Sequence, residues 1–121
     1  EFARRYGPGR EPIYERFPER QPYPKGLPVF VSEYGGIRWA KDQSGWGYGN
    51  GPQSEEEFLA RYRGLTETLL RNPDHFGFCY TQLTDVEQEQ NGLYTYERKP
   101  KFDPAVIRSI NGQKAAMEEE N

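Results

Sequence analysis

A short apolar run that ends in an acidic residue most constrains the fold of this chain. Residues 28–36 read Pro-Val-Phe-Val-Ser-Glu-Tyr-Gly-Gly, and the apolar part predicts a strand at 27–32. A strand without polar alternation is typical of parallel sheets that are covered on both faces. We therefore expect Glu33 to lie at the carboxyl end of a buried strand, the edge at which α/β sheets and (β/α)8 barrels bind ligands. A structural ion pair with a nearby Arg or Lys is the alternative role for this acid.

A helix follows after a long loop that is rich in glycine and aromatic residues. Ser54 and Glu57 have the spacing of a capping box, in which Ser54 accepts from the amide of Glu57 and the Glu57 carboxylate reaches back. Apolar residues then recur at helical spacing as far as Arg71, where Asn72-Pro73 ends the pattern. The apolar face of this helix comprises Phe58, Leu59, Tyr62, Leu65, Leu69 and Leu70.

The second half of the chain repeats this order. The run at 76–80 predicts a second strand, a long polar loop follows it, and Asp103 with Pro104 predicts the start of a helix that runs to about Met117. The order strand, long loop, helix therefore occurs twice. This order is typical of two βα units, which make up a quarter of a (β/α)8 barrel. A doubly wound sheet is the alternative architecture, but no Gly-x-Gly-x-x-Gly follows either strand.

The length of the chain indicates a partial domain. A complete barrel takes about 250 residues, whereas this chain has 121, of which 34% are hydrophobic. We expect an irregular, proline-rich lead-in at 1–27 and two βα units at 28–121, which together form the C-terminal portion of a barrel. The remainder of the barrel, in the same or a partner chain, is then a required partner.

Composition excludes several functional classes. The net charge is −3 and the basic residues are scattered, so we expect no nucleic-acid partner. No window approaches the ~20 apolar residues of a membrane span. Cys79 is the only cysteine, which excludes an internal disulfide and a cysteine-based zinc cluster. His75 is the only histidine and falls at a helix-to-strand turn, where we expect a capping or surface role. Cytoplasmic and secreted locations both stay open.

The remaining chemistry is that of carboxylates and aromatic rings. Glycoside hydrolysis needs two carboxyl groups and aromatic surfaces for sugar rings, and it needs neither a metal nor an organic cofactor. Glu33 is one candidate carboxylate. Asp85, Glu87 and Glu89 follow the second strand, and we expect them to order that loop or to bind substrate. A calcium loop is the competing interpretation of these three acids, but the central glycine and the full ligand set are absent.

Three motifs resemble those of a known enzyme family. They are Ser32-Glu33-Tyr34-Gly35-Gly36, the block from Phe76 to Leu93, and Arg98-Lys99-Pro100-Lys101. They resemble the C-terminal part of the catalytic barrel of glycoside hydrolase family 2, the family of bacterial β-galactosidases, β-glucuronidases and β-mannosidases. The resemblance extends from about Tyr6 to Met117, with the motifs in the expected order.

This resemblance implies that the two strands are the seventh and eighth of the barrel and that Glu33 is the nucleophile of a retaining exo-β-glycosidase. The family's acid/base is a Glu after an Asn on the fourth strand, and no Asn-Glu pair occurs in this chain. Tyr80 is the closest match to a Trp that many members place beneath the sugar. The Asn-x-Lys-Gly pattern of glucuronidases is not present.

Two functions therefore follow from the sequence. The first is part of a retaining, β-galactosidase-like glycosidase that acts on a carbohydrate through a glycosyl-enzyme at Glu33. Its candidate substrate contacts are Tyr34, Trp39, Trp46, Tyr48, Tyr80 and Asp85. The alternative is a non-catalytic barrel fragment that binds carbohydrate or docks on a partner chain.

Overall fold

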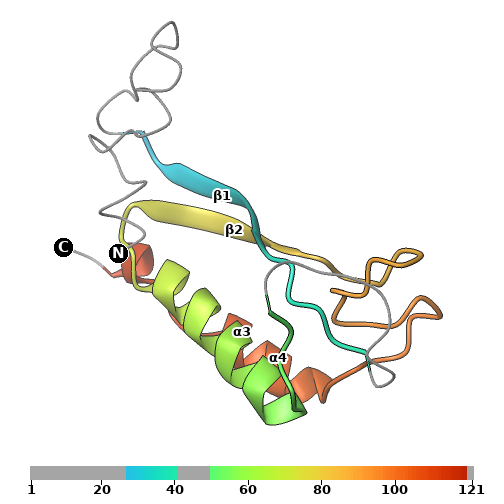
Figure 1. The fold of residues 1–121 in the computed structure, drawn as a ribbon. Coiled ribbons are helices and arrows are strands. Elements are labelled where there is room, and N and C mark those ends of the chain that lie inside the picture. The colour runs from blue at the N-terminus through green and yellow to red at the C-terminus, as the bar shows by residue number, and fades with distance from the viewer. Residues whose placement is uncertain (1–26, 41–49, 120–121) are drawn as a thin grey trace, which may run out of the picture.

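The fold has an α/β arrangement: a two-stranded parallel sheet with two helices (Figure 1). The computed structural model describes residues 27–40 and 50–119. The strands are β1 (Val29–Gly35) and β2 (His75–Thr81), the helices are α3 (Glu55–Leu70) and α4 (Pro104–Asn111), and a short 3-10 helix, η1, spans Ala116–Glu118. The two predicted strands and two predicted helices are confirmed. Most of the expected lead-in lies outside the described residues, as do Trp46 and Tyr48.

The first strand extends further than its sequence predicts. The prediction ended at residue 32, but β1 continues to Gly35, because Tyr34 pairs with Tyr80 and Gly35 with Thr81 of β2. Glu33 therefore lies within the strand and not just beyond it. After β1 the backbone turns through Gly35 and Gly36, which both have positive φ angles (96° and 64°) that favour glycine.

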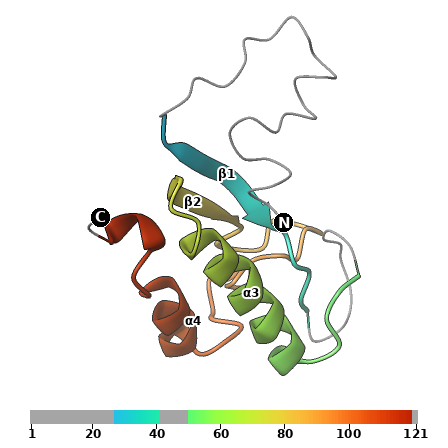
Figure 2. The same ribbon diagram turned by 90° about the vertical axis from the view of Figure 1, so that its left-hand side faces the viewer.

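Both helices lie on the same side of the sheet (Figure 2). Helix α3 contacts both β2 and α4. We call this side of the sheet the covered face. We call the other side the open face, because no element among the described residues lies over it. The apolar pattern of β1 predicted cover on both faces, yet Phe30 is 49% exposed while Val31 is buried.

Local sequence explains where α3 begins and which side of it is buried. The Ser54 hydroxyl accepts from the Glu57 amide (3.1 Å), as predicted, but the Glu57 carboxylate accepts from the amide of Gln53 (2.8 Å), one residue before the cap. The buried face was only partly predicted. Leu65 is 41% exposed, whereas Thr66 is fully buried. The buried residues of α3 centre on Tyr62 and Thr66, so Leu65 lies at the rim of that face.

Helix α4 is shorter than predicted. Asp103 caps its first turn by accepting from the Ala105 amide (2.9 Å), with Pro104 at the first helical position, as predicted. The helix ends at Asn111, six residues before the predicted end at Met117. Gly112 forms the C-cap, with its amide bonded to the Arg108 carbonyl (2.8 Å). Glycine is common at the ends of helices, and within a helix it is destabilising, so a helix tends to stop where a glycine occurs.

The core lies between the helices and the carboxyl ends of the strands. Its buried members are Ile37, Trp39, Phe58, Tyr62, Phe102 and Ile110. The rings of Phe58 and Phe102 stack with centroids 4.1 Å apart. Segments far apart in sequence, namely the turn after β1, helix α3 and the residues before α4, therefore share one apolar cluster. Aromatic contacts of this kind add about 0.5–1.5 kcal/mol each beyond the area they bury.

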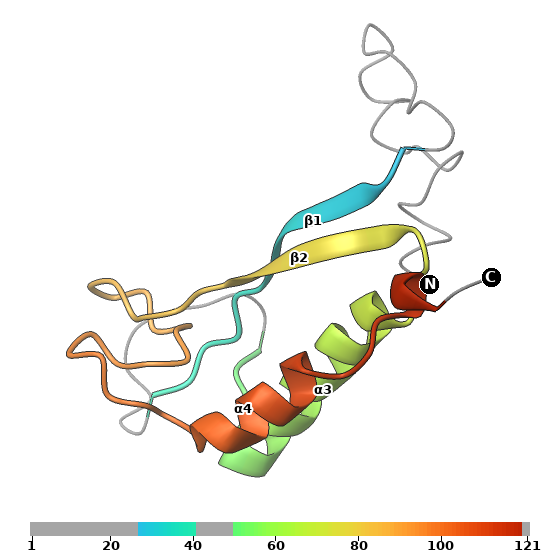
Figure 3. The ribbon, with the colours of Figure 1, turned by 180° about the vertical axis from the view of Figure 1, so that it is seen from behind.

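The long segment after β2 folds back on itself (Figure 3), and backbone hydrogen bonds hold it in place. The Leu93 amide donates to the Gln82 carbonyl (3.1 Å), the Asp85 amide to the Tyr94 carbonyl (3.0 Å), and the Lys101 amide to the Leu93 carbonyl (3.0 Å). The loop is therefore folded back on itself. It brings residues 90 and 101 beside the turn that follows β1.

Candidate active site on the open face

Glu33 lies at an irregularity in the sheet. Val31 pairs with Phe78 and Tyr34 pairs with Tyr80, so two residues of β1, Ser32 and Glu33, lie opposite the single residue Cys79. This arrangement is a β-bulge, which re-aims side chains and is common beside active sites. All three residues between the paired positions are exposed. We infer that the bulge presents Ser32 and Glu33 together on the open face.

The open face changes character along its length. At the amino-terminal ends of the strands, Phe30 and Phe76 contact each other with ring centroids 5.4 Å apart, and both are about half exposed. A second register shift, between Val29 and Phe30, accompanies this pair. Nearer the carboxyl ends, the face carries Ser32, Glu33 and Cys79. An apolar end followed by a polar end is the order found inside (β/α)8 barrels, where catalytic groups lie at the carboxyl ends of the strands.

Tyr34 and Tyr80 lie on the covered face, opposite Glu33. The Tyr34 hydroxyl forms a hydrogen bond of 2.8 Å with Thr66 Oγ1 on α3, and its ring packs edge-on against Tyr80, with centroids 5.4 Å apart. The Tyr80 ring also packs edge-on against Tyr62 of α3 (4.9 Å). Burial raises the pKa of both Tyr34 and Tyr80 well above the usual range of tyrosine, so both phenols stay neutral. The structure therefore places these two candidate sugar contacts against α3, on the side of the sheet away from Glu33.

Gly35 is required by the packing of Tyr80. A Cβ atom at residue 35 would overlap the Tyr80 ring, and the φ angle of 96° is one that other residues rarely adopt. Glycine is the residue type that meets both demands, because it has no side chain and tolerates positive φ. Gly35, two residues after Glu33, thus allows the strand to end against an aromatic ring.

Asp85 and Trp39 meet in a buried polar cluster centred on Lys101. The Lys101 ammonium donates to the Asp85 carboxylate (2.6 Å), to the Trp39 carbonyl (2.7 Å) and to the Gln90 carbonyl (3.3 Å). Asp85 also accepts from the Gly92 amide (2.9 Å). The side chains of Lys101 and Asp85 are 6% and 9% exposed. Burial lowers the pKa of Lys101, and Asp85 raises it back in part. Asp85 therefore orders its loop, one of the two roles expected for it.

A cavity of about 550 Å³ adjoins this cluster. Its lining combines rings, acids, amides and ammonium groups: Trp39, Ala40, Asp85, Glu87, Gln90, Thr95, Tyr96, Glu97, Lys99, Pro100 and Lys101. Trp39 is 9% exposed and also belongs to the core, so little of its surface is accessible from this cavity. The structure thus brings together two of the predicted substrate contacts, Trp39 and Asp85.

The three acids after β2 do not converge on one point. Asp85 is paired with Lys101, and Glu89 accepts from the side-chain amide of Asn91 (3.1 Å), while Glu87 is exposed. Within residues 27–40 and 50–119, no group of three or more His, Cys, Asp or Glu side chains could hold a metal ion. These contacts give the calcium-loop interpretation no support.

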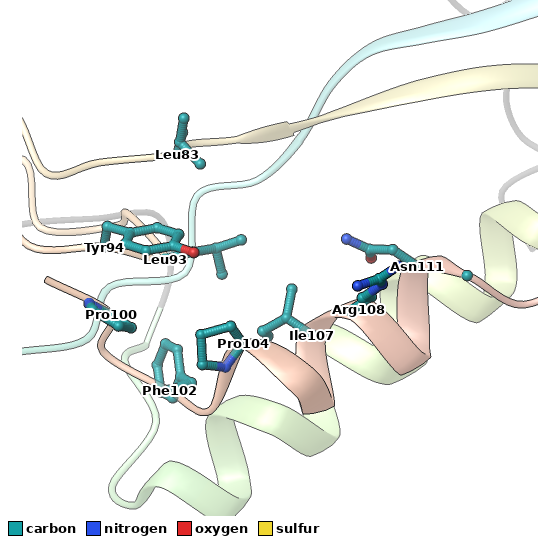
Figure 4. Close-up of a pocket in the computed structure, with 10 residues that line it drawn as sticks. Leu83, Leu93, Tyr94, Pro100, Phe102, Pro104, Ile107, Arg108 and Asn111 are labelled. Carbon is teal, nitrogen blue, oxygen red and sulfur yellow. The ribbon is translucent and has the colours of Figure 1, made fainter. Parts of the chain in front are cut away.

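A second cavity, of about 470 Å³, lies between α4 and the folded loop (Figure 4). Leu83 and Leu93 extend toward it from the loop, and Ile107, Arg108 and Asn111 extend from α4. Most of the lining is apolar. It contains none of the residues that the sequence predicted as substrate contacts.

His75 does not lie on the surface, one of the two roles expected for it. It is the first residue of β2 and is 5% exposed, and its imidazole interacts with the backbone of Leu69 in the last turn of α3, which agrees with the expected capping role. Its Nε2 atom lies 3.3 Å from the side-chain nitrogen of Asn72. Burial lowers the pKa of the imidazole, although the Leu69 backbone and Asp74 act in the opposite direction.

Thr66 and Lys101 are the residues of this region that sequence reasoning missed. Thr66 interrupts the apolar pattern of α3, but nothing nearby in the sequence indicates its partner, which is 32 positions away. Lys101 belongs to a motif quoted for the family resemblance. Its role was not apparent because its carbonyl partner, Trp39, is 62 positions away.

Comparisons with known proteins leave the family of this chain open. No protein-family model matches the sequence. A search of curated proteins likewise finds no significant match. Among the described helices, none has the length and apolar character needed to cross a membrane.

Proposed function

We propose that this chain supplies the seventh and eighth βα units, and the nucleophile Glu33, of a retaining exo-β-glycosidase resembling glycoside hydrolase family 2. The observation that carries the proposal is the position of Glu33. It is an exposed carboxylate in the carboxyl half of a parallel strand, presented by a β-bulge on the face opposite the helices. In a closed barrel this face becomes the interior, and its carboxyl end becomes the mouth of the active site.

The chemistry assigned to Glu33 is a double displacement. The ionised carboxylate attacks the anomeric carbon, the glycosidic bond breaks, and the leaving oxygen takes a proton from a second carboxyl group about 5–5.5 Å away. Water then attacks the glycosyl-enzyme ester, with that second group, now ionised, acting as the base. The second group comes from a part of the barrel that precedes this segment, since the chain contains no Asn-Glu pair.

The remainder of the barrel is the partner that this proposal requires. The apolar pattern of β1 is that of a strand covered on both faces. Among the described residues only one face is covered, and Phe30 and Phe76 are exposed on the other. Further barrel strands would cover these rings and surround Glu33.

The proposed substrate is a terminal β-linked sugar. Trp39 and the acidic and amide groups around its cavity are candidate contacts, because sugar recognition combines aromatic rings with planar polar groups. Trp46 and Tyr48 remain predicted contacts. In this proposal Tyr34 and Tyr80 are structural supports, because both lie on the covered face.

Replacing Glu33 by Gln in the full-length protein tests the nucleophile. The variant should lose turnover of an aryl β-glycoside by several orders of magnitude, because an amide cannot form the glycosyl ester. Glu56→Gln is the matched control, since Glu56 is an exposed carboxylate of α3 and should keep normal activity. A mechanism-based fluoro-sugar should also label Glu33. Near-normal turnover of Glu33→Gln, or a label on another residue, would remove Glu33 from the mechanism.

A second candidate function is a non-catalytic module that docks on a partner chain. The observation that favours it is the exposed Phe30–Phe76 pair on the open face. The two candidates differ in the chemistry they expect. A docking module forms its complex with no glycosidase activity and no covalent label, whereas the proposed enzyme is labelled at Glu33.

A further inference from the structure

We propose that Thr66 of α3 is a positioning residue for Glu33, and that it acts through Tyr34. The inference rests on the proposed function, because it concerns the aim of the proposed nucleophile. Thr66 lies on the covered face and Glu33 on the open face, so Thr66 itself contacts no substrate. Its effect passes through the strand residue next to Glu33.

The hydroxyl of Thr66 forms a hydrogen bond with Tyr34. Thr66 is fully buried, and its Oγ1 lies 2.8 Å from the Tyr34 hydroxyl. A threonine in a helix commonly bonds its hydroxyl to the carbonyl four residues earlier, as Thr68 does with Gly64 (2.7 Å). Thr66 bonds across to the sheet instead. The neighbouring Tyr62 hydroxyl donates to Asn111 Oδ1 (2.8 Å) and also interacts with the hydroxyls of Tyr34 and Thr66, so Thr66 and Tyr34 belong to one buried cluster of hydroxyls.

The bulge makes such an anchor necessary. In a regular strand, pairing fixes the direction of every side chain. Here Ser32 and Glu33 together oppose one residue of β2, so the ladder does not fix the direction of Glu33. On its other side, the chain turns away through two positive-φ glycines. Tyr34 is therefore the nearest firmly held residue after Glu33.

Tyr34 is held at its ring and at its tip. The ring packs edge-on against Phe78 (5.5 Å) and Tyr80 (5.4 Å), and the hydroxyl at its end is held by the hydrogen bond to Thr66, beside the Tyr62 hydroxyl. Rotation of Tyr34 would rotate the strand at residue 33 and move the carboxylate on the opposite face. A displacement of about 1 Å can slow a reaction on the order of 100-fold, because attack needs close alignment.

The test compares variants of the full-length protein with an aryl β-glycoside and a fluoro-sugar. Thr66→Val removes the hydroxyl from α3, and Tyr34→Phe removes it from the strand while keeping the ring. Both should lower kcat and the labelling rate by about 10- to 100-fold with little change in KM. Thr66→Ser restores a hydroxyl and should recover most of the rate. Thr68→Val is the matched control and should behave as the wild type.

The result that overturns the inference is wild-type kcat in Tyr34→Phe or in folded Thr66→Val. Tyr34→Phe keeps the test decisive if Thr66→Val does not fold, because it removes the same hydrogen bond without placing a new group in α3. Loss of stability with unchanged kcat, measured below the unfolding temperature, shows a merely structural role and also overturns it. Glu33→Gln separates the two levels: if it stays active, the proposed function fails, whereas if it is inactive while Thr66→Val is normal, only the positioning role fails.

Discussion

The two faces of the sheet differ in what holds their residues. On the covered face, Val31, Tyr34, Phe78 and Tyr80 pack against helices or against each other. On the open face, Phe30 and Phe76 contact each other, while Ser32, Glu33 and Cys79 are exposed. Both sets come from the same two strands, and the two register shifts, at Val29/Phe30 and at Val31/Tyr34, interrupt their alternation. The covered face therefore supplies stability, and the open face is where the chain can offer chemistry.

This difference explains why a carboxylate can occur in an apolar strand. A buried carboxylate without a partner is costly. The bulge at Ser32 and Glu33 turns the acid toward the open face, while the next residue, Tyr34, returns to the covered face. Within the described chain, Glu33 is exposed, and on the covered face the Tyr34 hydroxyl is hydrogen-bonded to Thr66. Substitutions on the covered face should therefore lower the stability of the fold, whereas substitutions on the open face should affect stability much less.

The largest effect on stability is expected at the buried ion pair between Lys101 and Asp85, which lies in the loops beyond the sheet. Lys101→Met should lower the free energy of unfolding by about 3–5 kcal/mol, because it leaves Asp85 buried without its cation. Urea unfolding monitored by circular dichroism measures this loss. Lys99→Met, at an exposed lysine, is the control and should change little. Adding Asp85→Asn to Lys101→Met should recover part of the loss, and a double variant that is less stable still would contradict this account.

A pair of aromatic substitutions on one strand tests the comparison directly. Tyr80→Ala, on the covered face of β2, should cost about 3 kcal/mol, because it empties space beside Tyr62, Tyr34 and Gly35. Phe76→Ala, on the open face of the same strand, should cost less than about 1 kcal/mol in this chain. The measurement is the urea midpoint of each variant. Equal losses would show that the two faces do not differ in this way.

The smallest expected effect is a pH dependence from His75. Burial lowers its pKa in the folded state, so between the folded and unfolded pKa values the unfolded chain binds more protons. Its contribution to stability is therefore present above the ordinary histidine pKa of about 6.5 and is lost as the pH falls below it. Urea unfolding at pH 7.5 and 5.5 measures the slope. His75→Gln should flatten it, and because the chain has no other histidine, an unchanged slope would exclude His75 as its source.

Elements of the fold were predictable where the signal is local. The cap at Ser54, the proline start at residue 104 and the two apolar runs each depend on neighbouring residues, and all correspond to elements of the structure. The end of α4 was predicted too late, although Gly112 marks it in the sequence. The extension of β1 to Gly35 was not predictable locally, because pairing with β2 maintains it.

The candidate site was predictable in its residues but not in its arrangement. The sequence named Glu33 as the candidate nucleophile and Tyr34 and Tyr80 among the candidate substrate contacts. The register of two strands decided that the acid lies on one face and the two rings on the other. Residue type can indicate the chemistry of a side chain. The face on which that side chain lies in a bulged sheet depends on the pairing with the partner strand.

The sequence by itself determined the order of the elements, the acidic residue next to an apolar strand, and the glycines that follow it, because these depend on side-chain type and short-range spacing. The tertiary structure decided which face Glu33 occupies. It also decided that Thr66 bonds to Tyr34, the residue after Glu33, and that Lys101 bonds to Trp39 in the segment after β1. The physical reason is separation along the chain. Hydrogen bonds and ring contacts between residues 32 to 62 positions apart exist only after the helices have packed on the sheet.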